Sequence, residues 1–140
     1  MNLPDTPCVV RARIFAHSLS MRYFGCPVYL VGGALYDYDP RDVDLVVPLP
    51  NDVFLACYGS RHDKIEAWGN GWATADPTPL WMRWARDCAK QSLELTRFCE
   101  RAVDFKTQPQ SFFDTLASKP RLRLSLDLRM DAGTPKETPP

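Results

Sequence analysis

Residues Val28–Val47, which read VYLVGGALYDYDPRDVDLVV, decide the fold. Two short apolar runs within them, residues 28–31 and 45–47, predict buried β-strands, of which the second begins at residue 43. Between the runs lie a glycine pair and an eight-residue spacer rich in turn-forming residues. We therefore expect a strand–turn–strand unit at the centre of an α/β (α+β) domain, with a small mixed sheet and helices mainly on one face.

The glycines and two aspartates of this stretch indicate a site. Gly32 and Gly33 end the first strand, and Asp42 and Asp44 open the second, so that both carboxylates project from one face of the strand. Neighbouring carboxylates repel each other, and bound Mg²⁺ would relieve that cost. A Gly-Gly turn lets backbone N–H groups approach an anion closely. The pattern predicts a site for a metal-chelated polyphosphate; the alternative is a turn-rich loop in which Asp42 only caps.

A third acid lies on a later predicted strand, residues 102–106. Asp104 is disfavoured there by strand propensity, so another interaction must compensate for it. It is either a further metal ligand or a surface residue paired with Lys106 or Arg101.

Together these residues resemble the DNA polymerase β-like nucleotidyltransferase superfamily, whose signature is an apolar strand, Gly-Gly or Gly-Ser, a spacer, Asp-x-Asp on a second strand and a later third acid. The wording of residues 28–47 looks most like the CCA-adding and poly(A) polymerases, although the spacer is shorter, so that only a turn or two of helix is expected. The resemblance implies a nucleotidyltransferase-like fold and two Mg²⁺ (or Mn²⁺) ions. Asp42 and Asp44 would bridge both ions. Asp104 would hold the ion nearer the nucleophile and take its proton, while the glycine pair would cradle the phosphates.

The activity implied by this resemblance is transfer of a nucleoside monophosphate from an NTP, ATP above all, to a hydroxyl acceptor with release of pyrophosphate. The acceptor would be a protein, a small molecule or an RNA end. CCA-adding and poly(A) enzymes carry further RNA-gripping domains for which 140 residues leave no room, so help from a partner subunit is one expectation. The alternative is a non-catalytic nucleotide-binding or protein-interaction domain on the same scaffold.

Cationic side chains for the triphosphate are harder to assign from the sequence. Arg41 adjoins the acids, and Arg86 and Lys90 are spaced to share one face of a long helix. We expect these three to be nucleotide-binding candidates. The alternative is an Arg41 ion pair with Asp39 or Asp42, and a solvated helix face for the other two.

The remaining elements follow from periodicity and turn signals. In the first helix, Val10, Ile14, Leu19 and Met21 recur at helical spacing and are expected to face the core. The second strand is expected to stop at Pro48. The catalytic domain is expected to span residues 1–129, with a disordered tail over 130–140. We predict helices over residues 7–24, 51–57, 79–99 and 111–117, and further strands over 64–68 and 121–129.

Composition narrows the class of protein. The formal net charge is zero, so no overall field draws the chain to nucleic acid, and no apolar run approaches the length of a membrane helix. The five cysteines form an odd set without a C-x-x-C pair, which is typical of reduced thiols in a cytoplasmic protein. His17 and His62 lack partners at catalytic or metal-binding spacing. The tryptophans are expected in the core, with base stacking as the alternative for Trp68 and Trp72.

Overall fold

The computed structural model describes residues 6–37, 39–59 and 79–125. The predicted strand at 64–68, the 130–140 tail, His62, Trp68 and Trp72 lie outside these residues. No helix in the described ranges is long and apolar enough to cross a membrane. The helices and strands of the described chain are, in order, α1 (Pro7–Arg22), β1 (Tyr29–Val31), η1 (Gly32–Leu35), β2 (Asp42–Leu49), α2 (Asn51–Tyr58), α4 (Pro79–Cys99), β3 (Ala102–Pro109), α5 (Gln110–Thr115) and β4 (Arg121–Arg123).

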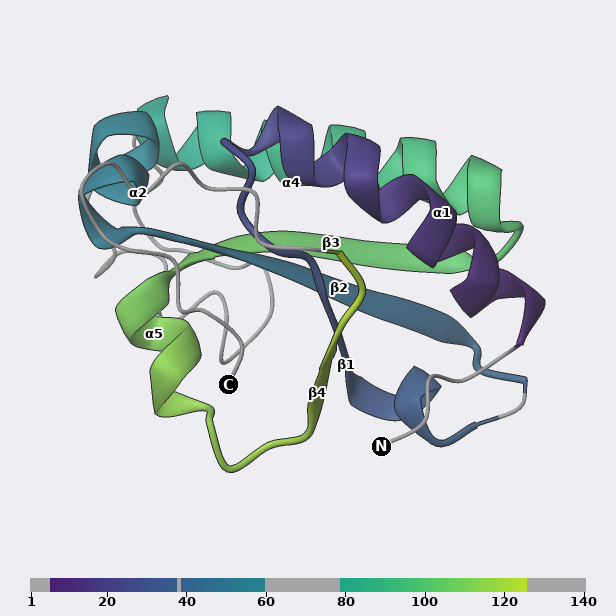
Figure 1. Ribbon diagram of the computed structural model, residues 1–140. Coiled ribbons are helices and arrows are strands. Elements are labelled where there is room, and N and C mark those ends of the chain that lie inside the picture. Colours follow the sequence, from purple (N-terminus) through teal and green to yellow (C-terminus); the bar gives the residue numbers. More distant parts are fainter. Residues whose placement is uncertain (1–5, 38, 60–78, 126–140) are drawn as a thin grey trace.

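The strands form one mixed sheet in the order β3-β2-β1-β4. β2 runs parallel to β3, and β1 runs antiparallel to both β2 and β4. Helices α1 and α4 pack against each other over one face of the sheet, whereas α5 lies on the other side (Figure 1). The expected α/β architecture, a small mixed sheet with helices mainly on one face, is confirmed.

Helix α4 covers the sheet with the apolar stripe that its sequence predicts, and it spans the predicted residues 79–99. Trp84 is fully buried, and its indole N–H donates to the carbonyl and hydroxyl oxygens of Thr107 on β3 at 3.2 and 3.1 Å. The other buried members of this face are Trp81, Cys88, Gln91, Leu95 and Cys99.

β3 is an edge strand, and α4 binds its outward backbone groups. The Ser92 and Thr96 hydroxyls each accept a hydrogen bond, from the N–H groups of Phe105 and Val103 respectively, both at 2.9 Å. Unpaired N–H groups along a strand edge would otherwise be open to another chain. These two contacts therefore fix the rotation of β3, with residues 103 and 105 toward the helix and residue 104 away from it.

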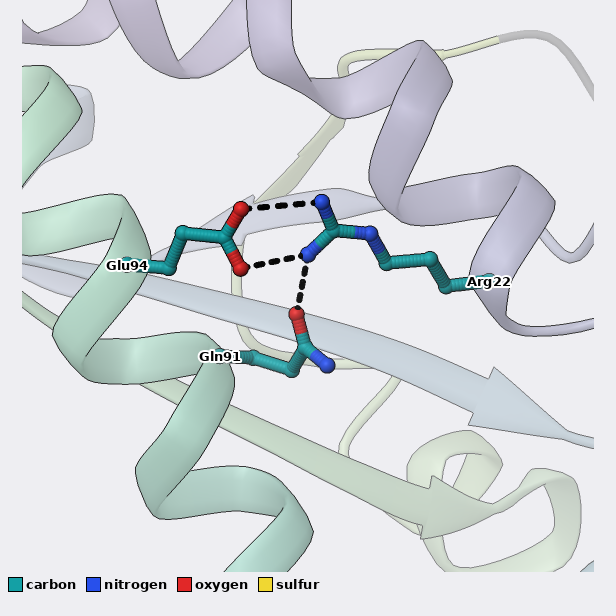
Figure 2. Close-up of polar contacts among 3 residues, drawn as sticks. All are labelled: Arg22, Gln91 and Glu94. Atoms are coloured by element: carbon teal, nitrogen blue, oxygen red, sulfur yellow. Dashed lines mark hydrogen bonds and ion pairs between the residues drawn. The ribbon is translucent and has the colours of Figure 1, made fainter.

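Arg22 joins the end of α1 to the middle of α4 (Figure 2). Its guanidinium donates to both carboxylate oxygens of Glu94, at 2.8 and 2.9 Å, and to the side-chain oxygen of Gln91 at 2.7 Å. Hydrogen bonding to Arg22 holds the pKa of Glu94 below its usual range. The fork geometry of the pair sets the relative position of the two helices above the sheet.

The expected core face of α1 is wrong in part. Val10, Ile14 and Met21 are exposed, and small side chains such as Ala12 and Ala16 are buried in their place. A helix that packs against both a sheet and a second helix needs small residues at its closest approach, which a search for large apolar residues overlooks.

Two predicted strand ends are also wrong. β2 continues through Pro48 to Leu49, and β3 runs on to Pro109. β1 pairs with β2 only as far as Val46, so the end of β2 has one neighbouring strand and tolerates proline as a sheet edge does. The last helix is α5 rather than residues 111–117. β4 ends at Arg123, so residues 124 and 125 do not continue the predicted 121–129 strand, and residues 126–129 lie outside the described part of the chain.

Candidate functional site

The three predicted acids lie on the sheet face opposite α1 and α4. The parallel register of β2 and β3 places Asp44 directly beside Asp104, and Asp42 lies two residues earlier on the same face of β2. The intervening Val43 and Val103 are buried in the core on the helix side. The structure therefore brings Asp42, Asp44 and Asp104 to one surface, as the sequence predicts.

These carboxylates act on one another. The pKa of Asp44 is raised to about 6, first by partial burial and then by the negative charges of Asp42 and Asp104, while Lys106 works in the opposite direction. The ammonium nitrogen of Lys106 lies 3.5 Å from Oδ2 of Asp104. Of the two partners that the sequence offered to Asp104, this lysine is the one used, because Arg101 pairs with Asp39.

The acids have the right chemistry for a hard divalent cation. They present only oxygen ligands on one face, and the charged form of Asp44 is destabilised in a way that a cation would reverse. In residues 6–37, 39–59 and 79–125, no three His, Cys, Asp or Glu side chains are already arranged as a metal site. The acids therefore fit Mg²⁺ or Mn²⁺ in ligand type and charge, but their side chains are not yet in the arrangement of a bound metal.

The glycine pair lies against the acids, and its two members differ. Gly32 has φ +77°, and a Cβ atom there would lie 2.6 Å from Oδ2 of Asp44. Only glycine both adopts this backbone conformation readily and leaves room for that carboxylate. A Cβ on Gly33 would meet nothing within 4 Å. The backbone of Gly33 is therefore open to a ligand, and the expected turn or two of helix is the single short η1.

A cavity of about 510 Å³ opens beside Gly33 on the same side of the sheet. Its walls come from β1, β2, η1, β3, α5 and the segment before β4, and most of its side chains are apolar. The Arg121 guanidinium lies 3.6 Å from the centre of the Phe113 ring and donates to the Phe113 carbonyl oxygen at 3.0 Å, which fixes one wall. Its lining residues include Val31, Tyr36, Val46, Gln108, Phe113 and Leu116.

Two of the three predicted cationic residues lie away from the acids. Arg86 and Lys90 are exposed on α4, on the other side of the sheet from the carboxylates. Arg41 is exposed immediately before Asp42, and Asp39, one of its two expected partners, pairs with Arg101 instead. Lys106, Lys119 and Arg121 are among the cations that the described structure brings to the face of the acids.

No protein-family model, curated protein or solved structure matches this chain. The resemblance to the DNA polymerase β-like superfamily therefore rests on residues 28–47 and Asp104. The structure adds the arrangement of the three acids and the glycine pair in space.

The coupling among the acids predicts a measurable titration. In metal-free buffer, the Asp44 carboxyl should titrate near pH 6, and Asp42→Asn or Asp104→Asn should each lower that midpoint by removing a like charge. Carbon-detected NMR of the side-chain carboxyls measures this directly. A midpoint below pH 4 in the wild type would contradict the close approach of the three acids.

The same shift determines how stability depends on pH. Because the folded pKa of Asp44 lies above its ordinary value of 3.8, its contribution to the free energy of unfolding is fully present below pH 3.8 and is lost as pH rises through about 6. Asp44→Asn should therefore raise the free energy of unfolding in metal-free buffer at pH 7.5 by about 1 kcal/mol, after allowance for solvent screening. Asp52→Asn, at an exposed position on α2, serves as the control in urea denaturation.

Proposed function

We propose that this chain is a metal-dependent nucleotidyltransferase that moves a nucleoside monophosphate from an NTP to a hydroxyl acceptor. The observation that carries the proposal is the in-register pairing of Asp44 with Asp104 on one sheet face, with Asp42 beside them and Gly32 against the Asp44 carboxylate. A carboxyl whose pKa is raised, as that of Asp44 is, and which lies among other acids at one surface, is a recognised mark of a functional site.

The roles proposed for the acids are those that the resemblance to the nucleotidyltransferases implies. Asp42, Asp44 and Asp104 would hold Mg²⁺ or Mn²⁺; when bound, two such ions supply polarisation of the attacking hydroxyl and neutralise the triphosphate. The acceptor oxygen attacks the α-phosphorus, and the bond from that phosphorus to the bridging oxygen breaks to release pyrophosphate. Asp104 receives the proton of the acceptor hydroxyl. Lys106, paired with Asp104, limits the negative charge that collects on this face before substrate arrives.

The glycine pair is the proposed binding position of the phosphates. Gly32 keeps the turn close to the Asp44 carboxylate, and the space in front of Gly33 admits a phosphate group to the backbone. The cavity beside Gly33 lies next to this position and has room for the nucleoside. A nucleotide with its phosphates over the acids and its sugar and base in the cavity uses each of these features once.

The acceptor approaches from the open side of the sheet. A hydroxyl of a protein, a small molecule or an RNA end satisfies the chemistry equally. The exposed apolar side chains of Val10, Ile14 and Met21 on α1, on the other side of the sheet from the acids, offer a surface for a partner subunit. The five cysteines are thiols and form no disulfide with one another in the described structure, which supports a reducing and therefore cytoplasmic setting.

A non-catalytic domain on the same scaffold is the second candidate. The observation in its favour is that the described carboxylates are not already arranged as a metal site. Such a domain would bind a nucleotide or a protein without needing a cation, so metal dependence separates the two candidates.

Metal-dependent binding of a nucleotide is the first expectation. With ATP at about 100 times its Kd, Mg²⁺ or Mn²⁺ should raise the melting temperature by about 5–10 °C, because a ligand that binds only the folded state stabilises it. Asp44→Asn should abolish the metal-dependent part of this shift. Differential scanning fluorimetry of the wild type and of Asp44→Asn, with each NTP in the presence and absence of metal, measures this shift in melting temperature.

Asp52→Asn again provides the matched control, since it removes one carboxylate from α2 and should leave the nucleotide shift intact. A shift that is unchanged by EDTA or by Asp44→Asn would favour the non-catalytic scaffold. Transfer of the label from an α-labelled NTP to a component of cell extract then identifies the acceptor of an active enzyme.

Gly33 tests where the phosphates lie. Gly33→Ala adds a methyl group to open space, so the fold should keep its stability while NTP affinity falls by about tenfold as the close approach to the backbone is blocked. Isothermal titration calorimetry measures the affinity and circular dichroism the fold. Unchanged affinity for ATP in the folded variant would place the phosphates elsewhere.

A further inference from the structure

The cavity beside Gly33 contains a buried acceptor that none of the described residues satisfies. Gln108, on β3, is only 6% exposed and lines the cavity, and its side-chain oxygen has no hydrogen-bond partner within residues 6–37, 39–59 and 79–125. Buried polar groups are nearly always hydrogen-bonded, so an unpaired acceptor facing a cavity points to a ligand that brings the donor.

The walls around Gln108 suit a flat, largely apolar ring. Val31 and Val46 form the floor on the sheet, and Phe113 and Leu116 come from α5 and the segment that follows it. Pockets of this kind bind small molecules by burying an apolar body and fixing its orientation with few polar groups. Tyr36, 68% exposed at the mouth, adds an aromatic face on which a ring can stack.

We propose that this cavity is the nucleobase subsite and that Gln108 selects adenine. The proposal rests on the proposed function for the placement of the phosphates, and it deepens that function by assigning the base. The Gln108 oxygen accepts a hydrogen bond from the 6-amino group, and its amide nitrogen donates to an adjacent ring nitrogen, which is the pairing of glutamine with adenine found in direct base readout.

Adenine also fits the rest of the cavity better than the other bases. It carries no carbonyl oxygen, whereas guanine, cytosine and uracil each carry at least one that would need a donor. Against the valine, leucine and phenylalanine side chains of the cavity, a carbonyl oxygen that neither Lys119 nor Arg121 reaches is costly to bury. The Gln108 amide pairs with the 6-amino group and one ring nitrogen of adenine together.

The spacing along β3 agrees with one bound nucleotide. Gln108 lies four residues after Asp104, and alternation places both side chains on the same face of the strand. Four residues of extended strand span about 13 Å, a distance that a nucleoside with its α-phosphate can bridge. A base held at Gln108 therefore brings the α-phosphate toward the acids.

Nucleoside binding tests this inference without phosphate or metal. Chemical-shift titration in EDTA compares adenosine with purine riboside, which lacks the 6-amino group, and with guanosine, cytidine and uridine. Adenosine should bind about ten times more tightly than purine riboside to the wild type, and the ratio should fall to about one in Gln108→Leu. Gln110→Leu, which removes a surface amide bound to Asp114, is the control and should keep the wild-type ratio.

The outcomes separate the subsite from the catalytic proposal. Equal affinity for adenosine and purine riboside in the wild type, or no binding of either, overturns the role of Gln108 and needs no variant to fold. The same titration on Asp44→Asn should keep the preference for adenosine. If the wild type prefers adenosine but shows no metal-dependent NTP binding, the base subsite stands and the catalytic proposal fails. If all four NTPs give equal metal-dependent binding, the catalytic proposal stands and the adenine subsite fails.

Discussion

The parallel pairing of β2 with β3 is the constraint on which the candidate site depends. It sets Asp44 beside Asp104, and any shift of one residue would turn one of these carboxylates into the core. The register is held from the helix side, where Ser92 and Thr96 of α4 bind the backbone of the edge strand. Helix packing on one face thus positions the acids on the other.

Packing of the sheet face under α1 and α4 offsets the electrostatic repulsion among Asp42, Asp44 and Asp104 on the opposite face. Apolar side chains from β2 and β3 alternate with the acids and lie in the core under α1 and α4. The pKa of Asp44 is raised first by partial burial and then by the charges of Asp42 and Asp104, and a bound cation would reverse that shift. Gly32 allows the turn to lie against Asp44 without displacing it. The arrangement is therefore more readily explained by ligand binding than by stability.

The sequence predicted those features that follow from local periodicity. Alternation in residues 42–47 put Asp42 and Asp44 on one face, and the long helix and the sheet class were also correct. It could not show which side of the sheet α4 covers, so Arg86 and Lys90 were grouped with the acids, from which the sheet separates them. It also ended the second strand too early, at Pro48, and the third at residue 106, and Gln108 was missed because its position in the cavity depends on the extension of β3.

The most direct test of the proposed metal site is anomalous scattering from a crystal grown with Mn²⁺ and a non-hydrolysable ATP analogue. If the paired acids bind the catalytic metal, a manganese peak should lie about 2.0–2.3 Å from carboxylate oxygens of Asp44 and at least one of Asp42 and Asp104, with the phosphates extending toward Gly33. Bound nucleotide with no manganese at these carboxylates, or manganese held elsewhere on the molecule, would contradict the claim that the paired acids are a catalytic metal site.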